Sequence, residues 1–111
     1  MKVEYKHKKL GKMLLDPKRR HKVFGERARK IDQRLSELNA VSCLEQLRKL
    51  LPNANCHELA GNKAGKFAVD ISQNFRMIFE PATNPPPRKA DGGLDWSGII
   101  SIRILAIEDY H

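Results

Sequence analysis

The chain has 111 residues and a mass of 12.7 kDa, which suits a single domain over residues 1–111 with one hydrophobic core. A hydrophobic fraction of 41% excludes a disordered chain. The lack of an apolar run of about 18 residues excludes a membrane span, and the lack of a signal-peptide core predicts a cytoplasmic protein. The 21 Lys+Arg against 13 Asp+Glu give a net charge of +8, which points to a polyanionic partner.

The first third of the chain predicts a short strand followed by helices. Residues 2–6 alternate polar and apolar side chains, as a strand does. A short helix is expected over 9–15. Asp16 is a preferred N-cap and Pro17 a preferred first helical residue, so they predict the start of a second helix. Apolar residues then recur every three or four positions. This second helix is expected to span 17–39, about 34 Å at about 1.5 Å per residue.

A third helix and a sheet are expected in the rest of the chain. Ser42 and Glu45 form a capping-box pattern before a leucine-rich stretch that ends at a proline. The apolar period then changes to two, so 66–72 and 75–80 predict a hairpin, and 99–107 predicts a central strand covered by helices. The predicted fold class is α+β, with amino-terminal helices packed on a small antiparallel sheet.

The segment 81–98 between the last two strands has no periodicity. It holds four of the six prolines, three of the seven glycines and the only tryptophan, Trp96. A loop of this length is either mobile or functional. Trp96 either contacts a partner or packs back onto the sheet.

The positive charge is concentrated in residues 1–34. This block contains 13 Lys and Arg and four acids, a net charge of +9, which leaves −1 for the rest of the chain. It either binds RNA, DNA or an acidic protein, or is the solvated face of the helices. For an RNA partner, the candidate contacts in this block are Arg19, Arg20 and Arg27.

The two cysteines do not predict a metal site. Cys43 and Cys56 lie 13 residues apart, with no second pair and no histidine at zinc-finger spacing. Without a secretory signal they are expected to be reduced thiols, and neither is assigned any chemistry.

A histidine and a glycine-bearing loop precede the predicted hairpin in the stretch CHELAGNKAGKF. Loop amides with Lys63 and Lys66 can hold a phosphate, and His57 can move a proton. The alternative is an ordinary loop histidine.

Arg76 interrupts an apolar run, so its guanidinium must reach solvent, a carboxylate such as Asp70 or Glu80, or an anionic ligand. The chain ends in Asp109, Tyr110 and His111, which are either a frayed tail or a cluster of proton-transfer groups. If 75–80 pairs with 99–107, Arg76 and this end can meet on one face.

Taken together, the His-Glu-Leu-Ala-Gly turn, the strand 66–72, the Gln-Asn-Phe-Arg-Met-Ile-Phe segment and the Glu-Asp-Tyr-His end resemble the HigB branch of the RelE/ParE toxin superfamily. The resemblance covers nearly the whole chain, except that smaller HigB-like proteins have a tight turn in place of 81–98. It implies a type II toxin that cleaves translated mRNA in the ribosomal A site. It also implies no metal or small-molecule cofactor, and a HigA-like helix-turn-helix antitoxin as partner.

The resemblance also implies roles for individual residues. Arg76 is expected to stabilise the developing phosphate charge, His57 and His111 to transfer protons in either assignment, and Tyr110 to orient the substrate or stack on a base. The expected RNA contacts near this site are Lys63, Lys66 and Asp109.

Two departures from the family pattern stand out. Some members have a lysine where Ala60 stands here, and Lys63 is the candidate substitute. Some have an arginine where Ser72 and Gln73 stand.

Two alternatives belong to other functional classes. One is a non-enzymatic ParE-like toxin that inhibits a protein such as DNA gyrase. The other is an RNA-binding module without cleavage, which would bind with a steep salt dependence.

Overall fold

The structure is a computed structural model and describes residues 1–109. Four helices and five strands alternate with short 3-10 turns. In chain order they are β1 (Lys2–Tyr5), α1 (Lys8–Leu15), α2 (Pro17–Phe24), η1 (Gly25–Arg27), α3 (Ala28–Ala40), α4 (Leu44–Leu50), η2 (Pro52–Ala54), β2 (His57–Glu58), η3 (Gly61–Lys63), β3 (Phe67–Asp70), β4 (Phe75–Pro81), η4 (Trp96–Gly98) and β5 (Ser101–Asp109). No helix within residues 1–109 is long and apolar enough to cross a membrane.

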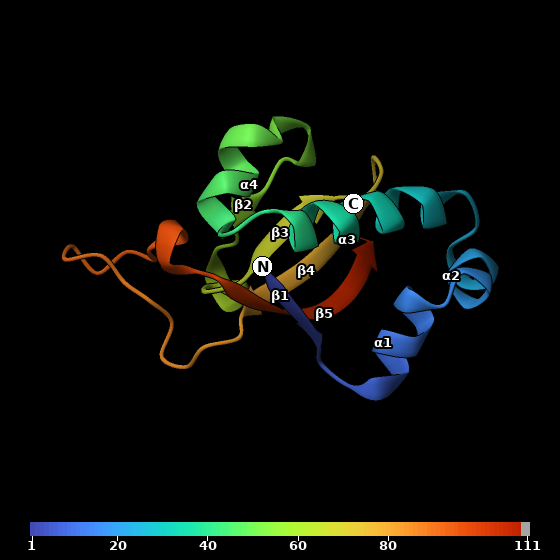
Figure 1. Cartoon of the computed structure of the whole chain (residues 1–111), viewed down its shortest axis with the longest axis horizontal. Helices are drawn as coiled ribbons and strands as arrows, with labels where there is room; N and C mark the ends of the chain where they lie inside the picture. The colour runs from blue at the N-terminus through green and yellow to red at the C-terminus, as the bar shows by residue number, and fades with distance from the viewer. Residues whose placement is uncertain (110–111) are drawn as a thin grey trace.

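The five strands form one mixed sheet in the order β1-β5-β4-β3-β2 (Figure 1). The meander from β2 to β5 is antiparallel, but β1 lies parallel to β5 with Val3 opposite Ile102. The expected α+β class and the hairpin are confirmed, whereas the purely antiparallel sheet is wrong. The strand expected over 2–6 is confirmed as β1, but it pairs parallel, and a parallel partner requires the long crossover that the rest of the chain supplies.

The expected long helix over 17–39 is broken in two. Its start is confirmed, because Asp16 Oδ1 accepts a hydrogen bond from the Lys18 amide at 3.0 Å. It ends at Gly25, whose φ of +57° is a conformation that glycine adopts without strain, and α3 begins after the turn η1. The apolar period persists across this bend because Phe24 and Ala28 both face the core, so periodicity alone did not reveal the break.

The capping box proposed for the next helix is wrong. The N-cap of α4 is Cys43, and the amide of Ser42 instead donates to Gln46 Oε1 at 2.8 Å. The helix begins one residue later than the pattern placed it. Its end before Pro52 is as predicted.

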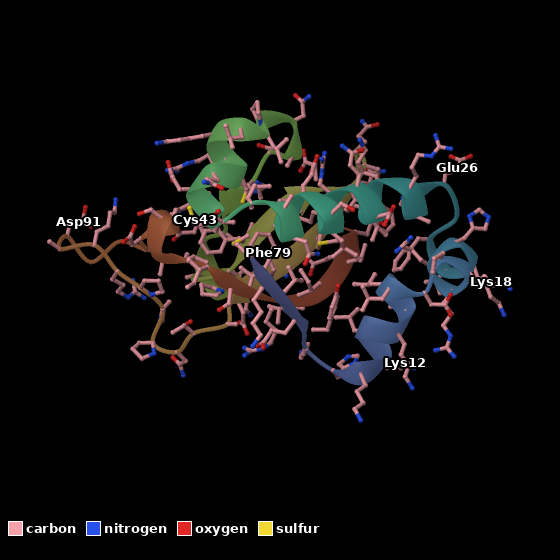
Figure 2. The ribbon with its side chains drawn as sticks, in the orientation of Figure 1. Lys12, Lys18, Glu26, Cys43, Phe79 and Asp91 are labelled. Carbon is pink, nitrogen blue, oxygen red and sulfur yellow. The ribbon has the colours of Figure 1, made fainter. Side chains whose placement is uncertain are left out.

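The hydrophobic core lies between one face of the sheet and the helices α1, α3 and α4. Figure 1 shows α3 lying across the sheet, with α4 towards one end of it and α1 and α2 at the other. Phe67 and Phe79 stack at the centre with ring centroids 5.7 Å apart, and Figure 2 shows Phe79 inside and Lys12 and Lys18 pointing outward. Within residues 1–109, the helices α1 to α4 leave the other face of the sheet uncovered. The expected position of β5 inside the sheet is confirmed, but helices cover it on one face only.

The segment 81–98 leaves the sheet and returns to the core at Trp96. The indole packs edge-on against Phe67 at 4.9 Å, and the Arg48 guanidinium lies 4.2 Å above it. Leu94 is buried, and an isolated bridge joins it to Arg88. Of the two interpretations of Trp96, packing onto the sheet is therefore confirmed.

Candidate active site

The strand register gathers charged side chains on the face of the sheet that no helix covers, here called the open face. Val69 and Met77 are opposite each other and point into the core. Their neighbours Asp70, Arg76 and Glu108 are also in register across β3, β4 and β5. Because side chains alternate along a strand, these three lie together on the open face.

Glu108 binds two cations from different parts of the chain. Lys63 Nζ lies 2.9 Å from both carboxylate oxygens, and Arg76 Nη2 lies 3.2 Å from Oε1. The hydrogen bonds from Lys63 and then from Arg76 hold the pKa of Glu108 below its usual value. Arg76 therefore pairs with Glu108 rather than with either carboxylate suggested by the sequence, and Glu80 binds Arg103 instead at 3.0 Å.

The ion pair of Lys63 also places the loop around η3 on the open face. Strands β3 and β4 lie between β2 and β5, so Lys63 can reach Glu108 only if this loop crosses them. Ala68 and Ile78, whose side chains point to the open face, are buried accordingly. The loop thus brings a second cation to Arg76.

His57 faces the same side of the sheet from the edge strand β2, opposite Ala68. Its Nδ1 lies 2.7 Å from the Asn55 carbonyl oxygen, which can only accept, so Nδ1 carries the proton and Nε2 of the neutral ring is left with a lone pair. The Asn55 side chain donates to Asp70 Oδ2 at 3.1 Å. Strands β2 and β4 stand about 10 Å apart, and His57 is in line with Ala68 and Ile78 rather than with Arg76, so the two side chains share the open face without being adjacent.

Arg34 of α3 holds the backbone beneath these residues from the core side. It is not among the residues predicted from the sequence. Its side chain is buried, with Nε 2.7 Å from the Asp70 carbonyl and Nη2 3.1 Å from the Asn53 carbonyl. Glu37 neutralises it at 2.8 Å. The missed signal is positional, because Arg34 sits between Ile31 and Leu35 on the apolar face of the helix.

The structure does not bring every predicted residue to this cluster. Lys66 precedes β3 at the end of the strand away from the charged row. Asp109 is opposite Phe75, so its side chain points to the other face of the sheet. Tyr110 and His111 lie outside the described residues.

The predicted RNA contacts of the helices differ in how available they are. Arg19 is exposed, with 61% of its side chain accessible. Arg20 is 11% accessible because it donates to the Leu14 carbonyl at 2.7 Å and pairs with Asp32 at 3.4 Å. Arg27 lies beside the β3–β4 turn, 4.0 Å above the Phe75 ring. Arg20 thus joins the helices, whereas Arg19 and Arg27 can meet a partner.

Within residues 1–109, the potential metal ligands do not cluster, and one of the two thiols has a raised pKa. No three His, Cys, Asp or Glu side chains there come together as a metal site would require. Cys43 and Cys56 are free thiols, and burial raises the pKa of Cys56 to about 12. This thiol stays protonated at neutral pH.

The lowered pKa of Glu108 predicts a pH-dependent contribution to stability. Since its folded pKa lies below the unfolded value of about 4.3, the contribution is complete above that value and is lost as the pH falls through the folded pKa. Glu108→Gln is expected to lower the free energy of unfolding at neutral pH, with the deficit vanishing in acid. Urea denaturation between about pH 7 and about pH 3 checks this. Glu58→Gln, at an exposed carboxylate without an ion pair in residues 1–109, is the control; an equal deficit at every pH contradicts the prediction.

Helices on one face of a five-stranded mixed sheet, with a charged row on the other, define this α+β fold. No protein-family model and no curated protein sequence matches the chain. The fold is similar to that of a YoeB/ParE toxin from Agrobacterium tumefaciens, with a TM-score of 0.52, 12% sequence identity and 100% of each chain covered. The predicted RelE/ParE resemblance is therefore confirmed at the level of the fold, and the HigB branch stays a prediction.

Proposed function

We propose that this protein is the toxin of a type II toxin–antitoxin pair, and an endoribonuclease that cleaves translated mRNA on the ribosome. The observation that supports the proposal is the pair of cations Lys63 and Arg76 on the open face of a toxin-like fold, with His57 on the same side of the sheet in β2. Cleavage of a phosphodiester by its own 2′-hydroxyl requires a proton acceptor at the hydroxyl, positive charge at the phosphate and an acid at the leaving oxygen, and these three residues can supply the first two.

The reaction forms the bond from the 2′ oxygen to phosphorus and breaks the bond to the 5′ oxygen, leaving a 2′,3′-cyclic phosphate and a 5′-hydroxyl. His57 Nε2 accepts the 2′ proton, since its Nδ1 is held by the Asn55 carbonyl. Arg76 and Lys63 stabilise the charge on the non-bridging oxygens. His111, which lies outside the described residues, is the proposed acid that protonates the leaving 5′ oxygen, with Tyr110 beside it to stack on a base.

Lys63 and Arg76 can bind an RNA phosphate only when Glu108 releases them. In the free protein its carboxylate binds both Lys63 and Arg76, so an RNA phosphate must take its place between them. A phosphate oxygen offers these donors the same kind of charge-assisted hydrogen bonds. The open face is therefore organised for a phosphate before RNA arrives.

The basic helices serve the same function at longer range. Lys12 and Lys18 are exposed and point away from the core (Figure 2). Together with their neighbours they form the surface that we assign to ribosomal RNA and, in the silenced state, to a HigA-like helix-turn-helix antitoxin. Attraction of this kind weakens steeply with salt.

Cleavage in a reconstituted translation system tests the proposal. The purified protein is expected to cut mRNA only on translating ribosomes, with 5′-hydroxyl ends mapped by primer extension and ligation after phosphorylation. Expression in cells is expected to arrest growth, with rescue by the co-expressed antitoxin.

A plasmid supercoiling assay on purified DNA gyrase separates the main alternative. Unchanged mRNA together with inhibited gyrase would overturn the proposal in favour of a ParE-like protein inhibitor. Ribosomal RNA binding without cut products would leave an RNA-binding module.

A further inference from the structure

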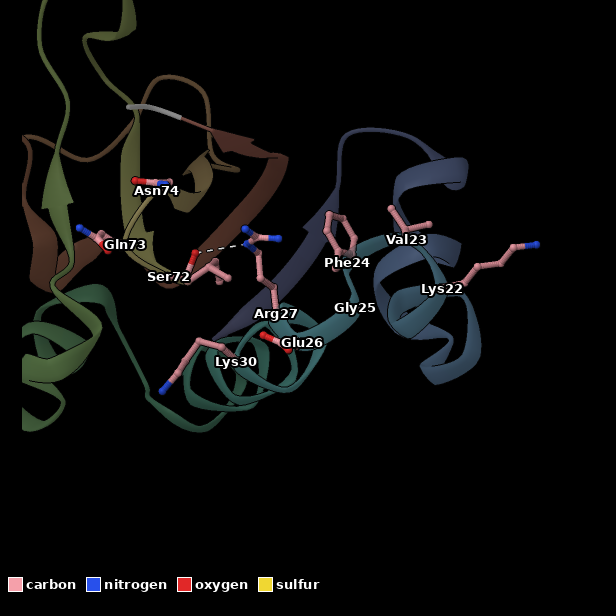
Figure 3. A pocket seen from close by; sticks show the side chains of 11 residues that line it. Lys22, Val23, Phe24, Gly25, Glu26, Arg27, Lys30, Ser72, Gln73 and Asn74 are labelled. Carbon is pink, nitrogen blue, oxygen red and sulfur yellow. Dashed lines mark hydrogen bonds between the residues drawn. The ribbon is translucent and has the colours of Figure 1, made fainter.

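A groove opens between the helices and the β3–β4 turn, at the end of the sheet that carries Arg76 (Figure 3). It is lined by residues 22–27 and Lys30 on the helix side and by residues 71–74 on the turn side, and its volume is about 800 Å³. Sites for small molecules occupy about 300–1,000 Å³, so one nucleotide fits. We refer to it as the helix–hairpin groove.

The groove is positively charged. Lys22, Arg27 and Lys30 line it together with one acid, Glu26. On the opposite face of the sheet Lys63 and Arg76 are bound by Glu108, so the groove adds positive charge outside that pairing. This balance favours an anionic ligand.

Arg27 is held in place at the centre of the groove. Its guanidinium lies 4.0 Å above the Phe75 ring, and its Nε donates to Ser72 Oγ at 3.4 Å. The residue is nevertheless exposed, so the side of the guanidinium away from Phe75 is accessible. A planar cation fixed in this way is a surface on which an RNA base stacks.

The turn supplies groups that can hydrogen-bond to the edge of a base. Figure 3 shows Gln73 and Asn74 on the turn side of Arg27 and Phe24 on its helix side. Each amide offers both donors and an acceptor, which a base edge requires and a phosphate does not. This combination distinguishes the groove from a surface suited only to an acidic protein.

We propose that the helix–hairpin groove binds the nucleotide of single-stranded RNA next to the scissile phosphate. The base stacks on Arg27 and contacts Gln73 and Asn74, while Lys22 and Lys30 bind flanking phosphates. The assignment rests on the proposed function, since Arg76 marks the scissile phosphate. Asn74 lies in the turn two residues before Arg76, so RNA bound in the groove would pass round this end of the sheet to bring its next phosphate to Arg76 on the open face.

Binding of an uncleavable RNA tests the groove separately from cleavage. The probe is a short fluorescent 2′-O-methyl oligonucleotide, which lacks the attacking hydroxyl, and anisotropy is measured over a range of salt. The double variant Lys22→Gln/Lys30→Gln is expected to bind about tenfold more weakly, with the slope of log K against log salt reduced by about 1.4 for two lost phosphate contacts. Lys49→Gln/Lys89→Gln removes the same charge outside the groove and is expected to retain the wild-type slope.

A second variant tests stacking without changing the charge. With 2-aminopurine placed beside the scissile position, wild-type protein is expected to quench its fluorescence, and Arg27→Lys to lose the quenching while keeping the salt slope. Equal salt slopes for the two double variants, or an absence of RNA binding by the wild type, would overturn the groove assignment. So would a Lys22→Gln/Lys30→Gln variant that binds RNA like the wild type and loses only antitoxin binding. Binding in the groove without any mRNA cleavage would overturn the proposed function and leave the groove standing.

Discussion

Replacing Arg76 by alanine is expected to lower the rate of mRNA cleavage on the ribosome by about 100- to 1,000-fold, the usual effect of removing a charge-stabilising donor. The guanidinium is 16% accessible and lies in register between Asp70 and Glu108, so no other cation can take its position from the strand. Arg76→Lys keeps the charge but not the planar pair of donors, and is expected to retain an intermediate rate. Single-turnover cleavage of mRNA on purified translating ribosomes measures the rates of the wild type, Arg76→Ala and Arg76→Lys.

The control for this series is Arg88→Ala, which removes an exposed arginine from the loop 81–98. Its rate is expected to match that of the wild type. Thermal unfolding of each variant confirms that the fold is retained. Wild-type cleavage by Arg76→Ala would remove this residue from the mechanism and with it the main support for an endoribonuclease.

Replacing Arg34 by alanine is expected to lower the free energy of unfolding by about 3–5 kcal/mol, the range for breaking a buried ion pair. The substitution removes the ion pair of Glu37, which keeps only its hydrogen bond from Gln33, and removes the Arg34 donors to the carbonyls of Asp70 and Asn53. A domain of this size has about 5–15 kcal/mol in total, so much of the stability is lost. Urea denaturation measures the change.

Arg29→Ala is the matched control, because Arg29 lies in the same helix and is exposed. Its effect is expected to stay within about 0.5 kcal/mol. Arg34→Lys retains the charge with fewer donors and is expected to fall between the two. If Arg34→Ala unfolds at the same urea concentration as Arg29→Ala, the three hydrogen bonds contribute no net stability.

The two arginines lie on opposite sides of the sheet. Arg34 holds the backbone at the end of β3 and at the turn before β2, and Arg76 lies on the opposite side of the same strand pair. Loss of Arg34 should therefore displace Asn55 and His57 as well as destabilise the domain. The sheet thus separates a buried guanidinium from the one that we propose to be catalytic, although both arise from runs of apolar residues.

The local elements followed from local physics and could be predicted. Asp16 caps a helix by accepting a hydrogen bond from the Lys18 amide, Pro52 ends one by lacking a donor, and the period-two segments on either side of residues 71–74 pair through a short turn. The break at Gly25 could not, because a glycine permits either backbone conformation and the apolar period continues through it. The choice of Arg76 as a candidate needed only the cost of burying a charge.

What the sequence determined by itself was the α+β class, the hairpin, the basic first third and the candidates His57 and Arg76. Only the tertiary structure decided that β1 lies parallel to β5, that the loop bearing Lys63 crosses the open face, and that Glu108 rather than Asp70 or Glu80 binds Arg76. These pairings join residues 32 to 99 positions apart. Residue type sets which charges attract, but strand order and register set which of them can meet, and neither is encoded in the spacing of neighbours.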